Sequence, residues 1–597
     1  MLAKVPEALP FLSRLDAPLL ALSPRDDWRI RDSFEGVWIS GATGSGKTSG
    51  SGKSIAYSFL KAGYGGLVLC AMPSERYLWE RYAAECGRSS SLIVFDASGD
   101  LRINFLNYEL ARHADNRPVT FNVVRMLSHI LDVAEGKGGQ NTTENPFWRT
   151  SMQQLLTNCI APLWAAKGEV TLASLMRMIA TRPKTEEQRT SRAWWDKSEW
   201  GKIFIDAWRD AKHPYPDEDY HAALDWWQHT FLSDDPRTPA NVIATLSARL
   251  QPFLSGRMRE IFATTTNIVP ELTHEGAIIL MDFPIPDWDE AGILAQQLFK
   301  YLWQRSVERR PADDRTRPVF LWADECQYFI SPYDAKYQAL ARQKRAATVY
   351  ITQNLPTFYD RIGSARPEHT AHALLGNFQT KIFHANSCRD TNHYAAELIG
   401  KSIQWRRNVG QGENEGWTDG WNEGTNSGWN DSTNESWNEG TNAGENASGT
   451  IGTSRNRGTS RGSSYSDGGG WSSSRQGGSW NSNYSYGRNE GSNDGEGTST
   501  GQSKGWSFGW SRGKSGGSSR GTSGGSSRGT SGGRSGGTNR SAGASEVIDY
   551  QVQPGWFTAL RNGGNANRGI VEGLLFQGGR QFDHSNSTFI PCMFPQS

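Results

Sequence analysis

Residues 38–48 read Trp38-Ile39-Ser40-Gly41-Ala42-Thr43-Gly44-Ser45-Gly46-Lys47-Thr48, and this stretch decides the fold. It satisfies the pattern G-x-x-x-x-G-K-[ST], which is typical of a glycine-rich loop between a buried strand and a helix. Glycines let successive backbone N–H groups point into one concavity, where they and the helix N-terminus hold phosphate oxygens. The sequence therefore predicts a nucleotide phosphate site formed by Gly41, Ala42, Thr43, Gly44, Ser45, Gly46, Lys47 and Thr48.

Two side chains at the end of this loop have predicted roles of their own. Lys47 is expected to reach the β- and γ-phosphates, and the Thr48 hydroxyl is expected to bind Mg²⁺. A second Gly-Lys-Ser follows at Gly52-Lys53-Ser54, but Lys47 stands where that frame needs its first glycine. Only the first frame is thus a phosphate site, and it fits ATP and GTP equally because the loop contacts phosphates rather than the base.

Strand and helix patterns alternate around the loop. Apolar runs at 65–71 and 92–96 predict buried strands, and residues 74–82 predict a helix between them. This alternation indicates an α/β fold with a central, mostly parallel sheet and helices on both faces. The predicted order is an adaptor (1–35), a first ATPase part (36–117), an all-helical domain (118–255), a second ATPase part (256–407), a disordered insertion (408–545) and closing strands (546–597).

The second half of a hydrolytic site follows the helical segment. Pro318 to Glu325 is an apolar run that ends in two acids. In this context Asp324 is expected to hold the Mg²⁺ shell and Glu325 to polarise the attacking water. A further strand ends at Gln353, where the carboxyl ends of parallel strands face the ligand. Gln353 is predicted to lie near the γ-phosphate, the alternative being a turn-capping amide.

A basic segment precedes that last strand and contains Arg342, Lys344 and Arg345. In a ring-shaped oligomer, one of these residues could serve as an arginine finger in the neighbouring subunit's site. A solvated charged face is the alternative interpretation.

Gly, Ser, Asn, Thr, Arg and Glu dominate residues 408–544, where near-repeats such as Trp421-Asn422-Glu423-Gly424 and Trp437-Asn438-Glu439-Gly440 recur. Such a tract buries too little apolar area to offset chain entropy, so it is predicted to be disordered. Its spaced tryptophans suit contacts with partners or single-stranded nucleic acid, and a passive linker is the alternative. The tryptophans of the helical segment are expected to pack in its core rather than stack on bases.

Composition narrows the classes of protein. The net charge of +1 gives no global nucleic-acid or membrane signal, so DNA contacts would require local basic patches. Six cysteines show no metal-binding spacing, as expected of reduced thiols in a cytoplasmic protein. The sequence has neither an apolar run long enough for a membrane helix nor the order of a signal peptide.

Taken together, these motifs resemble the coupling ATPases of type IV secretion and conjugation (the TraG/TraD kind), relatives of hexameric DNA translocases. The resemblance covers about residues 35–405 and 546–595. The stretches that carry it are Gly41–Thr48, Phe320–Glu325, Arg342–Gln353, Leu375–Ile382, Ala395–Gly400 and Gly573–Arg580. Two departures are the Ala71–Glu75 segment, where many members have Asp-Pro-Lys, and the missing N-terminal membrane helices.

The resemblance implies a RecA-like motor domain in a homo-hexamer around double-stranded DNA or a nucleoprotein, using ATP and Mg²⁺. It implies catalytic roles for Lys47, Glu325, Gln353 and Arg342, with metal binding by Thr48 and Asp324. Arg342 is favoured over Arg345 as the finger. Because no membrane segment is predicted, a role at a secretion channel would need a separate membrane partner that brings this cytoplasmic protein to the inner membrane.

Three functions fit the sequence: a motor for conjugative transfer or element mobilisation, a translocase of the segregation, packaging or defence type without a channel, and a scaffold assembled by nucleotide. The Asp324-Glu325 pair disfavours the scaffold, because binding alone does not require a catalytic acid.

Overall fold

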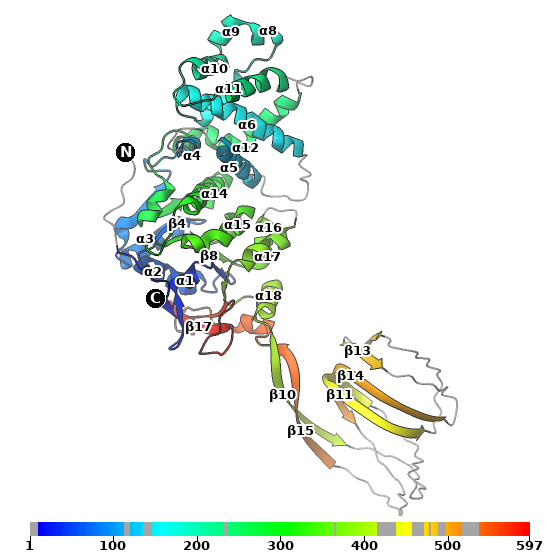
Figure 1. Cartoon of the computed structure of the whole chain (residues 1–597). Helices are drawn as coiled ribbons and strands as arrows, with labels where there is room; N and C mark the ends of the chain where they lie inside the picture. Colours follow the sequence, from blue (N-terminus) through cyan, green and yellow to red (C-terminus); the bar gives the residue numbers. More distant parts are fainter. Residues whose placement is uncertain are drawn as a thin grey trace, which may run out of the picture. The chain divides into compact units, whose positions relative to one another are not determined.

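The computed structural model describes residues 10–112, 120–134, 146–231, 237–362, 366–414, 438–456, 471–476, 479–486, 497–515 and 537–596. The chain forms two compact units: Met1–Gly400 with Val552–Ser597, and Lys401–Gln551 (Figure 1). The first unit contains every residue of the predicted site. In the described part of the chain, no helix combines the length and the apolar character that membrane crossing requires.

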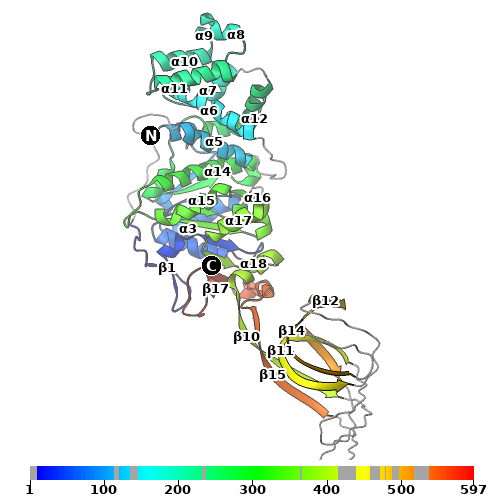
Figure 2. The same cartoon turned by 45° about the vertical axis from the view of Figure 1, so that its right-hand side comes forward.

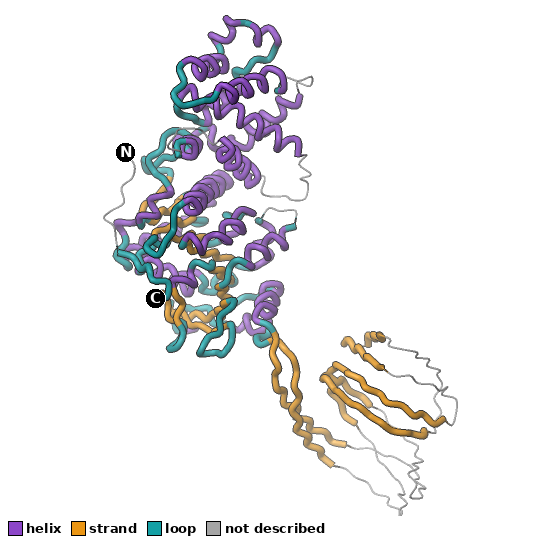
Figure 3. Tube along the Cα trace, viewed as in Figure 1, coloured by secondary structure: helices purple, strands orange, loops and turns teal. Residues whose placement is uncertain are grey.

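A nine-stranded sheet organises the first unit. Its strand order is β17-β16-β9-β3-β8-β7-β4-β6-β5, and β9 through β5 run parallel while β16 and β17 are antiparallel to their neighbours. Figure 3 shows these strands in orange among the helices. The strands are β3 (Val37–Ser40), β4 (Gly65–Leu69), β5 (Leu92–Asp96), β6 (Ile278–Asp282), β7 (Val319–Ala323), β8 (Ala346–Thr352), β9 (Thr380–Phe383), β16 (Ile570–Gln577) and β17 (Phe589–Pro595).

Each face of the sheet has its own apolar core, because successive side chains of a strand point to opposite faces. In β3, Trp38 belongs to one core, whereas Val37 and Ile39 belong to the other. In β7, Leu321 lies in the same core as Trp38, and Phe320 lies in the opposite core. The helices α2 (Lys53–Lys61) and α3 (Pro73–Glu85) cover one face. The opposite face is covered by α14 (Ile285–Arg309), α15 (Pro332–Ala341), α16 (Leu355–Arg361), α17 (Pro367–Gly376) and α18 (Arg389–Ile399) (Figure 2). The predicted α/β fold is confirmed.

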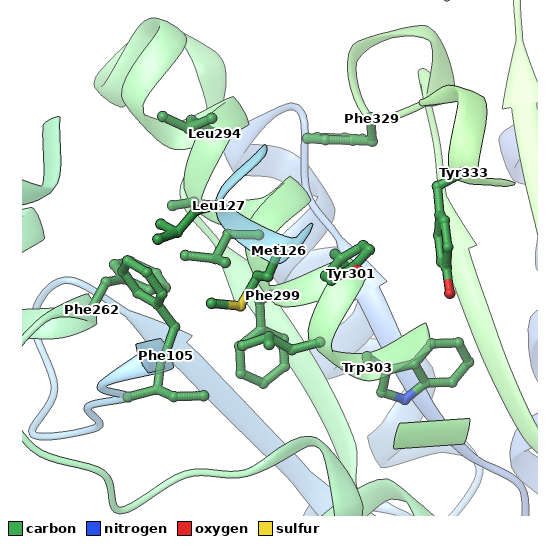
Figure 4. Close-up of a cluster of buried hydrophobic side chains, with 14 of the residues drawn as sticks. Phe105, Met126, Leu127, Phe262, Leu294, Phe299, Tyr301, Trp303, Phe329 and Tyr333 are labelled. Atoms are coloured by element: carbon green, nitrogen blue, oxygen red, sulfur yellow. The ribbon is translucent and has the colours of Figure 1, made fainter. Parts of the chain in front are cut away.

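The segment between β5 and β6 is helical, as predicted. Its helices are α4 (Phe105–Leu110), α5 (Thr120–Ala134), α6 (Pro146–Lys167), α7 (Leu172–Ala180), α8 (Glu186–Thr190), α9 (Arg192–Lys197), α10 (Glu199–Arg209), α11 (Asp217–Asp225), α12 (Arg237–Leu254) and α13 (Gly256–Phe262). Trp164, Trp200 and Trp227 are buried in its core, whereas Trp208 is half exposed. Side chains from this segment continue into the core around α14, as Figure 4 shows for Phe105, Met126 and Leu127 beside Phe299 of α14.

The ends of the chain complete the first unit. Residues predicted to be an adaptor form β1 (Pro18–Ala21), β2 (Asp27–Arg29) and α1 (Ile30–Ser33), and they place Trp28 and Ile30 in the core beneath α2. At the other end, β16 and β17 extend the sheet beyond β9. The short helices between strands and helices are η1 (Thr48–Gly52), η2 (Ser89–Ser91), η3 (Trp226–Thr230), η4 (Pro270–Glu275), η5 (Cys326–Tyr328), η6 (Arg342–Lys344), η7 (Pro554–Ala559) and η8 (Asn565–Asn567).

One part of the predicted boundary is wrong. Residues 547–552 were expected to close the ATPase sheet, but β15 (Gly537–Tyr550) pairs with β10 (Lys401–Asn414), outside that sheet. Their antiparallel register joins Lys401 to Tyr550 and Ile403 to Ile548. The second unit therefore begins at Lys401 and ends at Gln551, several residues beyond the predicted limits of 408 and 545 on both sides.

Within the tract predicted to be disordered, the structure describes strands only. They are β11 (Asn438–Asn456), β12 (Trp471–Gln476), β13 (Ser479–Tyr486) and β14 (Gly497–Ser515), in the order β11-β14-β13-β12, in a sheet separate from that of β10 and β15. Backbone hydrogen bonds hold such strands together whatever the sequence, and their Gly-, Ser- and Asn-rich composition offers little apolar area to bury. Several of the spaced tryptophans, including Trp417, Trp421 and Trp429, lie outside the described residues.

Candidate nucleotide site

The predicted site residues meet at the carboxyl edge of three adjacent strands. The loop with Lys47 follows β3, Gln353 follows β8, and Asp324 with Glu325 follows β7. In the sheet, β8 lies between β3 and β7, and Ser40 is paired with Thr352 while Ala323 is paired with Tyr350. Because parallel strands end at the same edge, this order brings the four side chains to one place.

The glycine-rich loop has the backbone that its sequence predicts. Gly44 and Gly46 have φ angles of 75° and 80°, in the left-handed region that glycine enters without steric cost. A Cβ atom on Gly46 would lie 2.4 Å from Val571 of β16, so the loop also packs too closely for a side chain there. The hydroxyl of Ser45 is buried and has no hydrogen-bond partner among the described residues. A concave loop with an unpaired buried hydroxyl fits a phosphate group.

Lys47 and Thr48 point toward the two acids that follow β7, Asp324 and Glu325. The Thr48 hydroxyl donates a hydrogen bond to the Asp324 carboxylate at 2.5 Å, and Lys47 Nζ lies 3.7 Å from Glu325 Oε1. Lys47 and Asp324 are each 7% exposed. A hydroxyl and a carboxylate in contact are two hard oxygen donors of the kind that Mg²⁺ accepts, so the pair fits the metal role predicted for both residues.

Glu325 is held in an unusual conformation by the groups around it. Its φ angle is 52°, which is uncommon for a residue other than glycine and costs conformational energy. Asp324 accepts its backbone N–H at 3.0 Å, and Gln327 donates to its carboxylate at 2.6 Å. The side-chain amide of Gln353 lies 3.4 Å from both carboxylate oxygens. Gln353, predicted to lie near the γ-phosphate and so to sense it, is thus in contact with Glu325, predicted to polarise the attacking water.

Burial changes the acid–base properties of two carboxyl groups here. Desolvation raises the pKa of Asp324, although the Thr48 hydrogen bond and the Lys47 charge oppose the change. Burial also raises the pKa of Glu75 well above its ordinary value, and the charge of Asp324 adds to the effect. Glu75 accepts hydrogen bonds from the backbone N–H groups of Met72 at 3.1 Å and Ala71 at 3.4 Å, which caps α3.

The two arginines considered as fingers are at the other edge of the sheet. Arg342 and Arg345 precede β8, whose seven residues span about 20 Å at the usual rise per residue. Arg345 is buried and donates to the carbonyls of Ser13 and Asp314, which is a structural role. Arg342 is 70% exposed on its side chain and pairs with Glu35 at 3.0 Å. Neither residue reaches the nucleotide loop of its own subunit.

Sequence reasoning missed three polar residues that surround the site. Gln327 links Glu325 to β8, since its amide oxygen accepts from the Thr352 hydroxyl at 3.0 Å. His384 follows β9 and contacts the Ser51 hydroxyl at 2.6 Å and the Glu572 carbonyl at 2.8 Å. Asn386 donates a side-chain hydrogen bond to the Gln353 carbonyl at 2.9 Å. His384 and Asn386 follow β9, which runs parallel to β3 and ends at the same edge of the sheet. The rule that polar residues just after parallel strands face the ligand, which identified Gln353, could have indicated these two residues as well.

Comparison with known proteins gives structural likenesses only. No family model matches the sequence, and no curated protein matches it. The chain is similar in structure to the bacterial conjugative coupling protein TrwBdeltaN70 in its unbound monoclinic form, with 14% identity, a TM-score of 0.46, and coverage of 66% of this chain and 80% of that one. TrwB in complex with the non-hydrolysable ATP analogue ADPNP has the same identity and coverage and a TM-score of 0.43. VirB4 of Thermoanaerobacter pseudethanolicus has 14% identity, a TM-score of 0.35 and coverage of 62% and 85%.

Likenesses of this strength do not assign a function, and the class of the chain follows from its own strands and side chains. The sheet order, the glycine-rich loop and the two acids that follow β7 define the RecA-like fold of the P-loop nucleoside triphosphatases. This is the class that the sequence motifs predict.

Proposed function

We propose that this protein is an ATP-hydrolysing motor that uses Mg²⁺. The observation that carries the proposal is the meeting of Thr48 with Asp324 and of Glu325 with Gln353 at one sheet edge, beside Lys47. Lys47 would bind the β- and γ-phosphates, and the loop from Gly41 to Thr48 would hold them through its backbone N–H groups. Mg²⁺ on Thr48 and Asp324 would neutralise charge that develops on the phosphate oxygens.

Glu325 is the group best placed to take a proton from the attacking water. It is an acid beside the γ-phosphate position that Lys47 defines, and hydrogen bonds from Gln327 and Gln353 orient its carboxylate. Gln353 would report the state of the γ-phosphate to this carboxylate. A nucleotide-binding scaffold would have no use for this oriented acid, which is why hydrolysis is preferred to binding alone.

The substrate we propose is double-stranded DNA or a nucleoprotein, moved by a homo-hexamer in conjugative transfer or the mobilisation of an element. The support is the resemblance of Gly41–Thr48, Phe320–Glu325 and Arg342–Gln353 to the coupling ATPases. In the ring, Arg342 would complete the site of the neighbouring subunit. The protein would act in the cytoplasm, and a membrane partner would bring it to a secretion channel at the inner membrane.

The test measures ATP hydrolysis by the full chain with and without double-stranded DNA, and compares the wild-type protein with the variant Glu325→Gln. We expect DNA to stimulate hydrolysis, and we expect the variant to lose about 10²–10⁴-fold in kcat while it still binds nucleotide. Glu368→Gln, which removes an exposed carboxylate on α17, controls for the loss of one negative charge. Hydrolysis that no nucleic acid changes would contradict the DNA motor and favour a protein-moving ATPase. Complete absence of hydrolysis would favour the scaffold.

A further inference from the structure

The loop that follows β9 contacts three parts of the first unit. His384 donates its backbone N–H to Ser40 at the end of β3, and Ala385 accepts the N–H of Ala42 in the nucleotide loop at 2.9 Å. Asn386, the next residue, is 6% exposed. This loop is therefore fixed against the nucleotide loop on one side, and its remaining contacts decide what else is fixed with it.

Asn386 connects Gln353 to the C-terminal segment that contains Phe557. Its side-chain amide donates to the Gln353 carbonyl at 2.9 Å, and its backbone N–H donates to the Phe557 carbonyl at 3.2 Å. Its amide oxygen accepts from Cys388 N–H at 2.9 Å, and its carbonyl accepts from Asn392 at 2.8 Å. With all these bonds made, Asn386 has one orientation. Gln353 in turn contacts Glu325, so a line of hydrogen bonds runs from Phe557 to the catalytic carboxylate.

Both ends of the second unit connect to this line. α18 begins three residues after Asn386 and leads into Lys401, where the second unit begins. The chain returns at Val552, and Phe557 lies five residues further on in η7. Phe557 is buried and its ring packs against Phe383 of β9 at 5.8 Å. The segments of the first unit that precede and follow the second unit along the chain therefore both contact Asn386: Asn392 of α18 donates to its carbonyl, and the Phe557 carbonyl in η7 accepts its N–H.

We propose that Asn386 is a positioning residue for Gln353, and that through it the attachment of the second unit sets the rate of hydrolysis. The inference rests on the proposed ATPase function. A shift of η7 or α18 would move Asn386, and Asn386 would move the Gln353 backbone relative to Glu325. Displacements of about 1 Å at a reacting group reduce rates strongly, so small movements of the attachment suffice.

The experiment compares Asn386→Ala with Asn377→Ala in the full chain. Asn377 is a matched control because its side chain also donates to a backbone carbonyl, that of Ala335 at 3.0 Å, at the end of α17. We expect Asn386→Ala to lower kcat about 10-fold or more while KM and the affinity for a non-hydrolysable ATP analogue change little. Asn377→Ala should leave all three near wild type. A double variant with Gln353→Ala should be no slower than Gln353→Ala alone, because both changes act through the same side chain.

A second readout does not depend on turnover. Deuterium exchange of residues 346–362 should speed up in Asn386→Ala and stay unchanged in Asn377→Ala, since only the first loses the bond to Gln353. Phe557→Leu, which keeps the core filled, should lower kcat in the same direction and be non-additive with Asn386→Ala. Equal kcat in Asn386→Ala and wild type, or additive effects with Gln353→Ala, would overturn the inference. If the wild-type protein did not hydrolyse ATP, the proposed function and the control of its rate would both be overturned. Faster deuterium exchange in Asn386→Ala than in wild type would, even then, support the role of Asn386 in positioning Gln353.

Discussion

Thr48 and Asp324 are 276 residues apart in the chain, and the hydroxyl of one donates to the carboxylate of the other at 2.5 Å. The contact crosses β8, because the strands that precede the two residues are not neighbours in the sheet. It also brings together the two protein oxygens that the sequence predicts for Mg²⁺. The two residues predicted to bind the metal are therefore in contact in the structure.

Removal of the Thr48 hydroxyl should weaken Mg²⁺ use without unfolding the protein. In Thr48→Ala, the Mg²⁺ concentration for half-maximal hydrolysis should rise about 10-fold or more, because one oxygen donor is lost. Thr48→Ser keeps the hydroxyl and should restore near wild-type behaviour. Titration of Mg²⁺ at saturating ATP measures both. Equal Mg²⁺ dependence in Thr48→Ala and wild type would exclude Thr48 from the metal site.

Lys47 and Lys53 provide a comparison of two similar dipeptides. Each lysine follows a glycine and precedes a hydroxyl residue, but only Lys47 is in the frame of the phosphate pattern and near Glu325. Lys47→Ala should abolish hydrolysis and weaken nucleotide binding, since the buried charge that is proposed to bind the phosphates is lost. Lys53→Ala should change kcat by less than about 2-fold. Equilibrium binding of a fluorescent ATP analogue, together with hydrolysis, separates the two outcomes.

Strong local signals made most of the site predictable. Lys47 and Thr48 are part of a motif, Asp324 follows the apolar run of β7 directly, and Gln353 follows Thr352 at the end of β8. The sequence pattern therefore indicated where these strands end. Asn386 also follows a strand, but an asparagine in a loop has no motif, and its role depends on partners at Gln353 and Phe557 that only the fold brings near.

Partner choice explains the error at the C-terminal boundary. The alternation around Ile548 correctly indicated a strand, but alternation does not specify which strand it pairs with. Pairing with Ile403 rather than with the nine-stranded sheet is decided by the tertiary fold. The exposed position of Arg342 at the opposite edge follows from its place before β8, whereas its contact with Glu35 does not follow from any local pattern.

His384 should make stability depend on pH. Burial lowers its pKa to about 4, and its ring is held neutral between the Ser51 hydroxyl and the Glu572 carbonyl. The unfolded chain, with an ordinary pKa near 6.5, binds the proton first as pH falls. The neutral ring's contribution is thus present in full above about pH 6.5 and is lost between about 6.5 and 4, by about 3 kcal/mol.

The measurement is the melting temperature of wild type and His384→Gln between pH 4.5 and 7.5. The variant should melt lower at pH 7.5, and its melting temperature should fall less steeply with acidity. Burial also lowers the pKa of His129 to about 4, so part of the slope should remain. His369→Gln, at an exposed position, controls for the loss of any histidine. Parallel curves for wild type and His384→Gln would contradict the prediction.

Arg342 should act on the site of a neighbouring subunit, because it lies about 20 Å from the end of β8 where Gln353 stands. Its side chain is 70% exposed and its partner Glu35 is in the same subunit, so assembly can redirect it. Arg342→Ala should abolish ATP hydrolysis while nucleotide binding persists, whereas Lys336→Ala, an exposed cation on α15, should have little effect.

Mixing two inactive variants tests the trans arrangement. Lys47→Ala has a defective loop and an intact Arg342, and Arg342→Ala has the reverse. If the arginine acts across the interface, each Arg342→Ala site beside a Lys47→Ala subunit regains a full set of groups, and an equal mixture should recover up to about a quarter of wild-type activity. An arginine that acted within its own subunit, or that only stabilised the fold through Glu35, would leave the mixture inactive. Recovery therefore requires both an oligomer and an Arg342 that reaches its neighbour.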